Sequence, residues 1–118
     1  MRIRREEELP VYERLGDVRA RAVTLGKIAD ILQARGQLDE ALRIYREEAL
    51  PVFERLGEEP SRFQVLHRLG MITLKLDKHE EARHYLTEAA ASCARIGNKA
   101  MQDRIQALLE KLDTPKPS

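Results

Sequence analysis

The chain has 118 residues, of which 35% are charged and 4% aromatic, and its formal net charge is +1. This length suits one domain with its own core, and the aromatic-poor, charged composition favours amphipathic helices over a β-sandwich. The near-neutral charge gives no overall field that would attract nucleic acid or an anionic membrane, so neither is expected as a partner.

The lone cysteine and the absence of long apolar runs bear on the compartment. Cys93 has no partner for an intrachain disulfide, and no apolar run approaches the roughly 18 residues that suggest a membrane span. We therefore expect a cytoplasmic protein.

An internal repeat organises the sequence. The segment Arg5–Gly16 reads REEELPVYERLG, and Arg46–Gly57, which begins 41 residues later (46 − 5), reads REEALPVFERLG. The two differ only at Glu8/Ala49 and Tyr12/Phe53. The same shift aligns apolar residues further along, namely Leu25 with Leu66, Ile28 with Leu69 and Ile31 with Ile72. A third, weaker copy at 82–97 is one residue shorter. The repeat predicts similar structural units in succession.

Within each unit, apolar residues recur at the three to five residue steps of amphipathic helices. Glycines follow four of these segments, where a left-handed C-terminal cap favours glycine: Gly16, Gly36, Gly57 and Gly97. The predicted helices span about 2–15, 18–34, 38–56, 60–76, 79–95 and 98–112. Residues 1–112 are expected to form one domain, and the proline-containing tail 113–118 to be disordered.

Two prolines lie inside predicted helices. Pro10 and Pro51 each remove a backbone hydrogen bond, which predicts a bend without a break. The third copy lacks both the proline and one residue. We therefore expect the extra residue of the other copies to form a local bulge at the kink.

Small residues at fixed spacing carry a resemblance to a known family. Ala29 aligns with Gly70 and Ala41 with Ala82, and within each unit the two small residues are 12 residues apart (29 to 41, 70 to 82). The wider pattern consists of Leu25, Ile28, Ala29, Leu32, Ala41 and Tyr45, then Leu66, Leu69, Gly70, Thr73, Ala82, Leu86 and Ala89. It resembles the tetratricopeptide repeat, in the long-unit form of kinesin light chains and bacterial arrays.

The resemblance implies an all-α fold, a right-handed α-solenoid of antiparallel helix pairs with about six helices, the last acting as a closing helix. It also implies a protein-interaction or scaffold module, not an enzyme, that needs no cofactor. First helices of the units would line a concave face, and their residues turned away from the core are the candidate partner-binding site. These are Lys27, Asp30, Gln33, Gln64, His67, Arg68, Met71 and Lys75.

The chemistry of these residues suggests a partner. Arg68 and Lys75 could pair with acidic groups, while Met71 offers an adaptable apolar contact, so we expect an acidic protein or peptide. The plainer alternative is that all eight are ordinary solvated surface residues.

The register indicates that the chain begins mid-repeat. Residues 2–15 align with 43–56, the second helix of a unit, and no first helix precedes them. Either this is a fragment of a longer array, or another copy covers the end. Leu9, Tyr12 and Leu15 would then support a homodimer through the N-terminal half-repeat. The alternative function is a structural spacer or self-assembling segment of a larger signalling protein.

Other chemistries are weakly indicated. His79 and His84 are five residues apart and therefore about 140° apart around a helix, which disfavours a shared metal. Cys93 lies in the small-residue run AAASCA, which is typical of helix packing. The basic residues near the N-terminus and in the next helix could form a nucleic-acid strip, but glutamates are interleaved with them.

Overall fold

The computed structural model describes residues 11–113, with side chains from residue 16 onward, and these residues form helices joined by short turns. The helices are α2 (Val11–Ala34), α3 (Leu38–Ile44), the π-helix η1 (Tyr45–Ala49), α4 (Leu50–Leu56), α5 (Glu59–Lys75), α6 (His79–Ile96) and α7 (Lys99–Asp113). Because α3, η1 and α4 follow one another without a break, they form a single rod. The predicted all-α class is confirmed.

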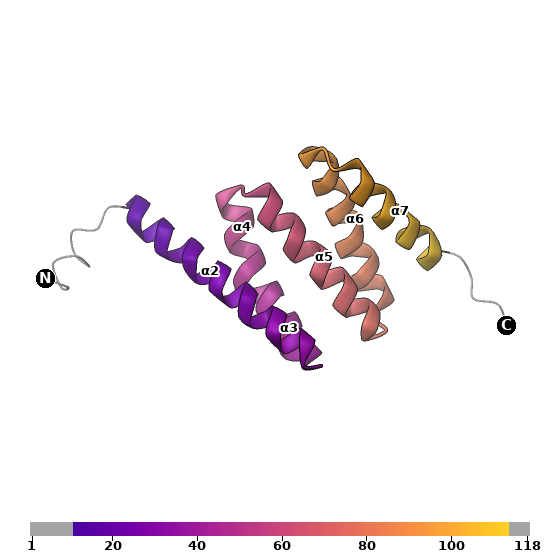
Figure 1. Ribbon diagram of the computed structural model, residues 1–118, viewed down its shortest axis with the longest axis horizontal. Coiled ribbons are helices and arrows are strands. Elements are labelled where there is room, and N and C mark those ends of the chain that lie inside the picture. The colour runs from indigo at the N-terminus through magenta and orange to yellow at the C-terminus, as the bar shows by residue number, and fades with distance from the viewer. Residues whose placement is uncertain (1–10, 114–118) are drawn as a thin grey trace, which may run out of the picture.

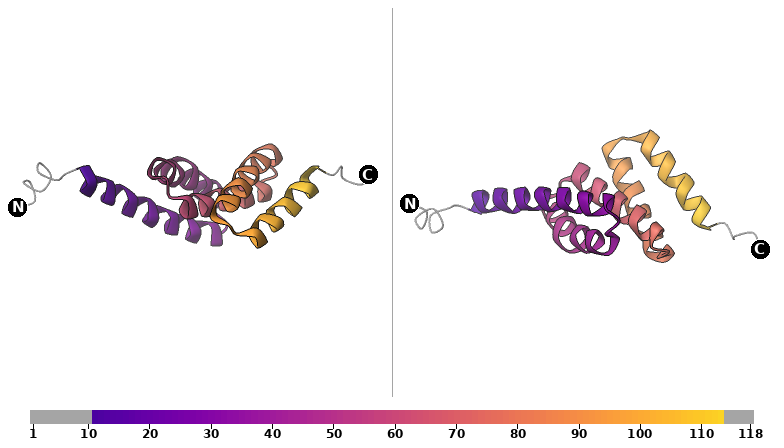
Figure 2. Two further views of the ribbon diagram at one scale, coloured as in Figure 1. Left: turned by 90° about the horizontal axis from the view of Figure 1, so that it is seen from above. Right: turned by 60° about the horizontal axis from the view of Figure 1, so that its bottom comes forward.

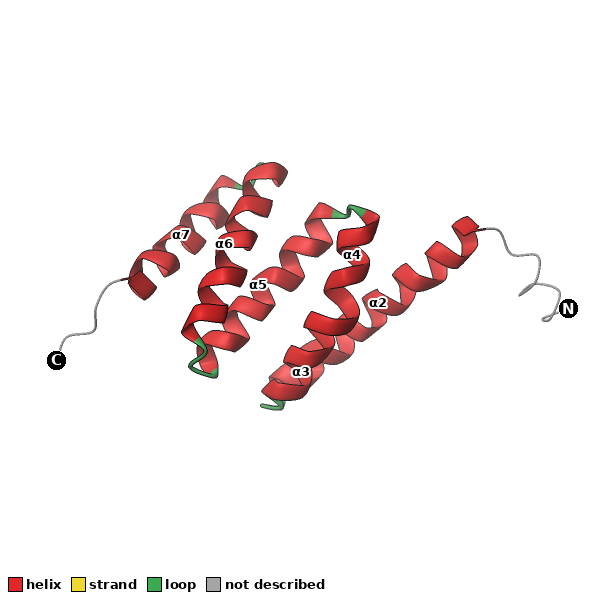
Figure 3. Cartoon of the chain, turned by 180° about the vertical axis from the view of Figure 1, so that it is seen from behind, coloured by secondary structure: helices red, strands yellow, loops and turns green. Residues whose placement is uncertain are grey.

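The helices lie in two layers. Figure 1 shows α2, α5 and α7 side by side in one layer, while the α3–η1–α4 rod and α6 cross behind them. Figure 3, seen from behind, shows the rod and α6 in front of their neighbours. Each second-layer helix packs against the first-layer helices before and after it in the chain. This alternation is the helix-pair arrangement that the repeat predicted.

Small residues allow the paired helices to approach closely. Ala29, Ala41 and Ala82 are fully buried. A Cβ atom added to Gly70 would lie only 2.6 Å from Leu86 Cδ2, so even a methyl group there would force the buried Leu86 side chain to shift. The prediction that a small residue is needed is confirmed at Gly70, and the three alanines are buried as the same prediction expects.

Three of the four predicted glycine caps are confirmed. Gly36, Gly57 and Gly97 have φ angles of 82°, 69° and 86°, in the left-handed region. The N–H of Gly57 donates to the carbonyl of Glu54, which satisfies one of the last carbonyls of α4.

The predicted cap at Gly16 is wrong, and with it the separation of helices 2–15 and 18–34. The helix α2 runs unbroken from Val11 through Gly16 to Ala34, as Figure 2 shows. In the next unit Pro60 lies in the first turn of α5, where a missing N–H is tolerated, and it prevents the helix from continuing backward. Its counterpart 41 residues earlier is Arg19, which continues a helix. Pro10 and the predicted end residues Leu9, Tyr12 and Leu15 lie outside the residues whose side chains are described.

The bulge expected near Pro51 is confirmed. The π-helix η1 spans Tyr45–Ala49 and ends two residues before this proline, which lies in the first turn of α4. Because Pro51 has no N–H to donate backward, a wider turn before it costs little. The π-helix buries Tyr45 and Ala49. At the C-terminus α7 includes Asp113, and the rest of the predicted tail lies outside the described residues.

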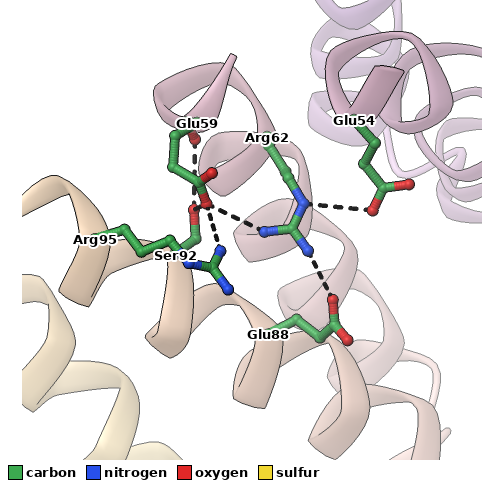
Figure 4. Close-up of polar contacts among 6 residues, drawn as sticks. All are labelled: Glu54, Glu59, Arg62, Glu88, Ser92 and Arg95. Carbon is green, nitrogen blue, oxygen red and sulfur yellow. Dashed lines mark hydrogen bonds and ion pairs between the residues drawn. The ribbon is translucent and has the colours of Figure 1, made fainter. Parts of the chain in front are cut away.

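A polar network fastens the α4–α5 turn to α6. Arg62, whose side chain is only 17% exposed, donates to Glu54 at 3.4 Å, Glu59 at 3.2 Å and Glu88 at 2.9 Å (Figure 4). Nearly buried arginines with several carboxylate partners hold their geometry better than isolated surface pairs. The network therefore fixes the second unit against the first.

A second part of the network converges on Glu59. Ser92 Oγ donates to Glu59 Oε2 at 2.6 Å, and Arg95 Nη1 lies 2.9 Å from the same oxygen. The hydrogen bond from Ser92, then Arg95 and Arg62, lower the pKa of the Glu59 carboxyl against the opposing effect of burial. Glu59 therefore favours its charged form in the folded chain.

Substitution by alanine at two glycines should have opposite effects. Gly70→Ala should reduce the free energy of unfolding by about 1 to 3 kcal/mol, because the new methyl group overlaps the buried Leu86. Gly26→Ala, where a Cβ meets no atom within 4 Å, should raise it by about 0.5 to 1 kcal/mol through helix propensity. Urea unfolding of both variants measures the difference. Equal effects at the two sites would contradict the close α5–α6 contact.

Acid should weaken the Glu59 network. A glutamate in an unfolded chain has a pKa of about 4.3. Because the pKa of Glu59 is lower in the folded chain, its contribution to stability is full above that pH and is lost as the pH falls through the lowered value. Glu59→Gln should therefore lose less stability than the parent between neutral pH and pH values below 4. Urea unfolding across pH tests this, with Glu81→Gln, an exposed carboxyl on α6, expected to behave as the parent.

Candidate functional site

An open groove of about 340 Å³ lies between α2 and α5. The second-layer rod contributes Tyr45 and Phe53 to it, and Val23 of α2 and Val65 of α5 add apolar surface. Gly26 widens the groove because it carries no side chain. A concave site with apolar walls and few polar groups is the usual form of a peptide-binding or ligand-binding surface.

Three helices supply a polar cluster on one wall of the groove. The hydroxyl of Tyr45, from η1, donates to Asp30 Oδ1, from α2. Arg68 Nε, from α5, lies 3.1 Å from the same oxygen. Burial, then the hydrogen bond to Asp30 and the charge of Asp30, raise the pKa of Tyr45, so its hydroxyl keeps its proton. The cluster locks Asp30 in place and balances the charge of Arg68.

The groove has one cation with no such partner. Lys27 corresponds to Arg68 in the 41-residue register (68 − 27), and it is exposed. Arg19, at the end of the groove, is ion-paired with Glu58. Among residues 16–113, no side chain forms an ion pair with Lys27. A ligand carboxylate would therefore find its available partner at Lys27.

The structure brings together half of the residues predicted from the sequence. Lys27, Asp30, Gln64 and Arg68 line the groove. The other four, which do not line it, are Gln33, His67, Met71 and Lys75.

His67 has a packing role instead. Its ring stacks on Phe63, with centroids 5.7 Å apart. Burial, and secondarily the charge of Arg68, lower the pKa of His67, which favours the neutral ring.

Sequence reasoning missed the groove residues from the second-layer rod. Tyr45 corresponds to Leu86, a fully buried residue, in the register (86 − 45 = 41), so its pattern indicated core alone. Phe53 likewise is mostly buried. The rod crosses beneath α2 and α5, and this crossing brings Tyr45 and Phe53 to the groove.

Other surfaces considered from the sequence have clear structural roles. Arg19 pairs with Glu58, and Arg21 lies 3.6 Å from Glu48, so these members of the basic strip face acidic neighbours. Cys93 is fully buried, and burial raises the pKa of its thiol. Within the described part of the chain, no group of three or more residues is arranged to hold a metal ion.

The same described residues include no helix with both the length and the apolar character that a membrane crossing requires.

Comparison with known proteins identifies the repeat. A model of the tetratricopeptide repeat family matches residues 20–95, which is more than half of the chain and extends from α2 to α6. Searches among curated proteins and among solved structures found no match. The matched region contains the small-residue contacts, the glycine caps at Gly36 and Gly57, and every groove residue except Arg19. The chain therefore belongs to the tetratricopeptide repeat family.

Proposed function

We propose that this chain is a protein-interaction module that holds a peptide segment of its partner in the groove between α2 and α5. Tetratricopeptide repeats generally mediate protein–protein interaction or scaffolding and are typically not enzymes. The observation that carries the proposal is the open groove itself, with its apolar floor and the unpaired Lys27 on its wall.

The groove favours a peptide with one acidic and one large apolar side chain. The apolar side chain would be buried against Val23, Phe53 and Val65. An adjacent carboxylate would form a charge-assisted hydrogen bond with Lys27. Arg68 contributes less to this preference than the sequence suggested, because Asp30 already balances its charge.

Arg68 is better suited to the peptide backbone. Its Nε faces Asp30, and Asp30 is the one ion-pair partner of Arg68 among the described residues. Tyr45 holds Asp30, which in turn holds the guanidinium at the groove wall. A guanidinium has five N–H donors, and those of Arg68 that do not face Asp30 can donate to main-chain carbonyl oxygens of an extended peptide.

Charge reversal at two lysines tests the groove. We would select binders from a display library of random peptides on the immobilised chain, then measure their affinities by fluorescence anisotropy. Lys27→Glu should weaken the enriched peptides by about tenfold or more. Lys75 was also predicted as a binding residue but lies outside the groove, so Lys75→Glu should change affinity much less. Equal losses would show that the groove is not the binding surface.

Filling the groove provides a second test that is independent of charge. Gly26→Leu places a bulky side chain in the groove and should abolish binding of the same peptides, whereas Gly26→Ala should retain it. Thermal melts of both variants control for folding. Undiminished binding by Gly26→Leu, or a library that yields no binders at all, would favour the alternative of a structural spacer.

A further inference from the structure

The outer face of α2 exposes two large apolar side chains. Ile28 is 43% exposed and Ile31 is 53% exposed. Their counterparts one repeat later are Leu69 and Ile72 (28 + 41, 31 + 41), and both of these are fully buried. The two units therefore use the same apolar positions, but only the second unit covers them.

The covering element in the second unit is the helix that precedes α5. The α3–η1–α4 rod and α6 both pack against α5. The helix α2 has a counterpart of α6, namely the rod that follows it, but it has no described helix on its other side. Ile28 and Ile31 are exposed because α2 packs against one described neighbour, the rod, whereas α5 packs against two.

The sequence contains a near-copy of the missing helix. Residues 2–15 align with 43–56, and Arg5–Gly16 repeats Arg46–Gly57 with two substitutions. Ile44, Leu50 and Phe53 of the rod are buried. Their counterparts in the N-terminal segment are Ile3, Leu9 and Tyr12, which are all large and apolar or aromatic.

An ion pair of the second unit is also conserved in the register. Arg62 of α5 contacts Glu54 of α4 at 3.4 Å (Figure 4). The corresponding residues are Arg21 and Glu13 (62 − 41, 54 − 41). The Arg21 side chain lies 3.6 Å from Glu48 of its own chain, but it is 73% exposed and can therefore meet a second carboxylate. Within one straight helix these residues are eight apart, about 12 Å along the axis, which is too far for them to pair.

Because α2 is unbroken, a helix of residues 2–15 that covers Ile28 and Ile31 would have to come from a second copy of the chain. Val11 and Ile28 belong to one helix and are therefore about 25 Å apart along its axis. In this conformation residues 11–15 continue α2 away from Ile28 and Ile31, so a chain cannot pack a helix of its own residues 2–15 over these two side chains. A second copy, lying antiparallel, can place its segment there.

We propose that two copies of this chain form a reciprocal dimer, in which residues 2–15 of each cover Ile28 and Ile31 of the other. The two α2 helices pack antiparallel about a two-fold axis near Gly16, and Glu13 of each copy pairs with Arg21 of the other. The contact reproduces between chains what α4 and α5 form within one chain. Such an exchange of equivalent elements is an accessible route to a symmetric dimer.

One difference between residues 2–15 and their counterparts 43–56 is unfavourable for this packing. Glu8 occupies the position of Ala49, which is fully buried in η1. A carboxylate at such a position carries a desolvation cost. Glu8→Ala should therefore tighten the dimer by about tenfold, and weakening by this variant would overturn the proposed register.

The apolar face is tested by removing its two isoleucines. Sedimentation equilibrium of the parent chain should show a concentration-dependent approach to twice the monomer mass of 13.6 kDa. The double variant Ile28→Ser/Ile31→Ser should raise the dimer dissociation constant by about a hundredfold, since two-fold symmetry counts each change twice. Ile96→Ser, at an isoleucine 40% exposed on α6, is the matched control and should leave dimerisation unchanged. A parent chain that stays monomeric overturns the proposal.

Mixing two charge-reversed chains tests whether the contact is between copies. Glu13→Arg alone and Arg21→Glu alone should each weaken the dimer, because like charges then face each other twice. In a mixture, one chain of each kind forms two complementary pairs, so a heterodimer of near-parental affinity should appear. A mixture that dimerises no better than either variant alone would overturn the proposal and indicate a contact within one chain.

Discussion

The close contact of paired helices at small residues is the constraint on which the rest of the structure depends. Gly70 meets Leu86 where even a methyl group would displace the leucine side chain, and Ala29 and Ala41 are fully buried. Short interhelical distances hold each first-layer helix tightly on its second-layer partner. The rod can then cross beneath both α2 and α5, which leaves a groove between them with Tyr45 and Phe53 at its base.

The fold was largely predictable because its determinants are local or repeat every 41 residues. Glycines at positions 36, 57 and 97 mark left-handed caps, and Pro51 marks the π-helix. The break at Gly16 was predicted because a glycine follows an apolar segment there, as at Gly57. That prediction failed because Pro60, which stops the helix from continuing in the second unit, has Arg19 as its counterpart in the first unit. A glycine after an apolar segment permits a left-handed cap, but it does not by itself end a helix.

The candidate site was predictable only in part, because it depends on contacts between three helices. The register placed Lys27, Asp30 and Arg68 on first helices, and all three line the groove. It could not show that Asp30 pairs with Arg68, which reverses the relative importance of the two cations. Nor could it show that Tyr45, with the pattern of a core residue, reaches Asp30 with its hydroxyl. Such pairings depend on helix crossing geometry, which spacing along the chain does not determine.

The two ends of the described helix stack differ in how they meet solvent. The terminal helix α7 exposes no large apolar side chain, as expected of a capping helix, whereas α2 exposes Ile28 and Ile31. Most of the groove lies on another side of α2, since Asp30 and Ile28 are two residues apart and therefore about 160° apart around the helix axis. Ile31 and Lys27 are four residues apart and therefore only about 40° apart, so a peptide in the groove and a second copy on the outer face would occupy adjoining surfaces that meet at Lys27. Because α2 is continuous past Gly16, the same helix would both form a wall of the groove and carry the segment that joins the copies.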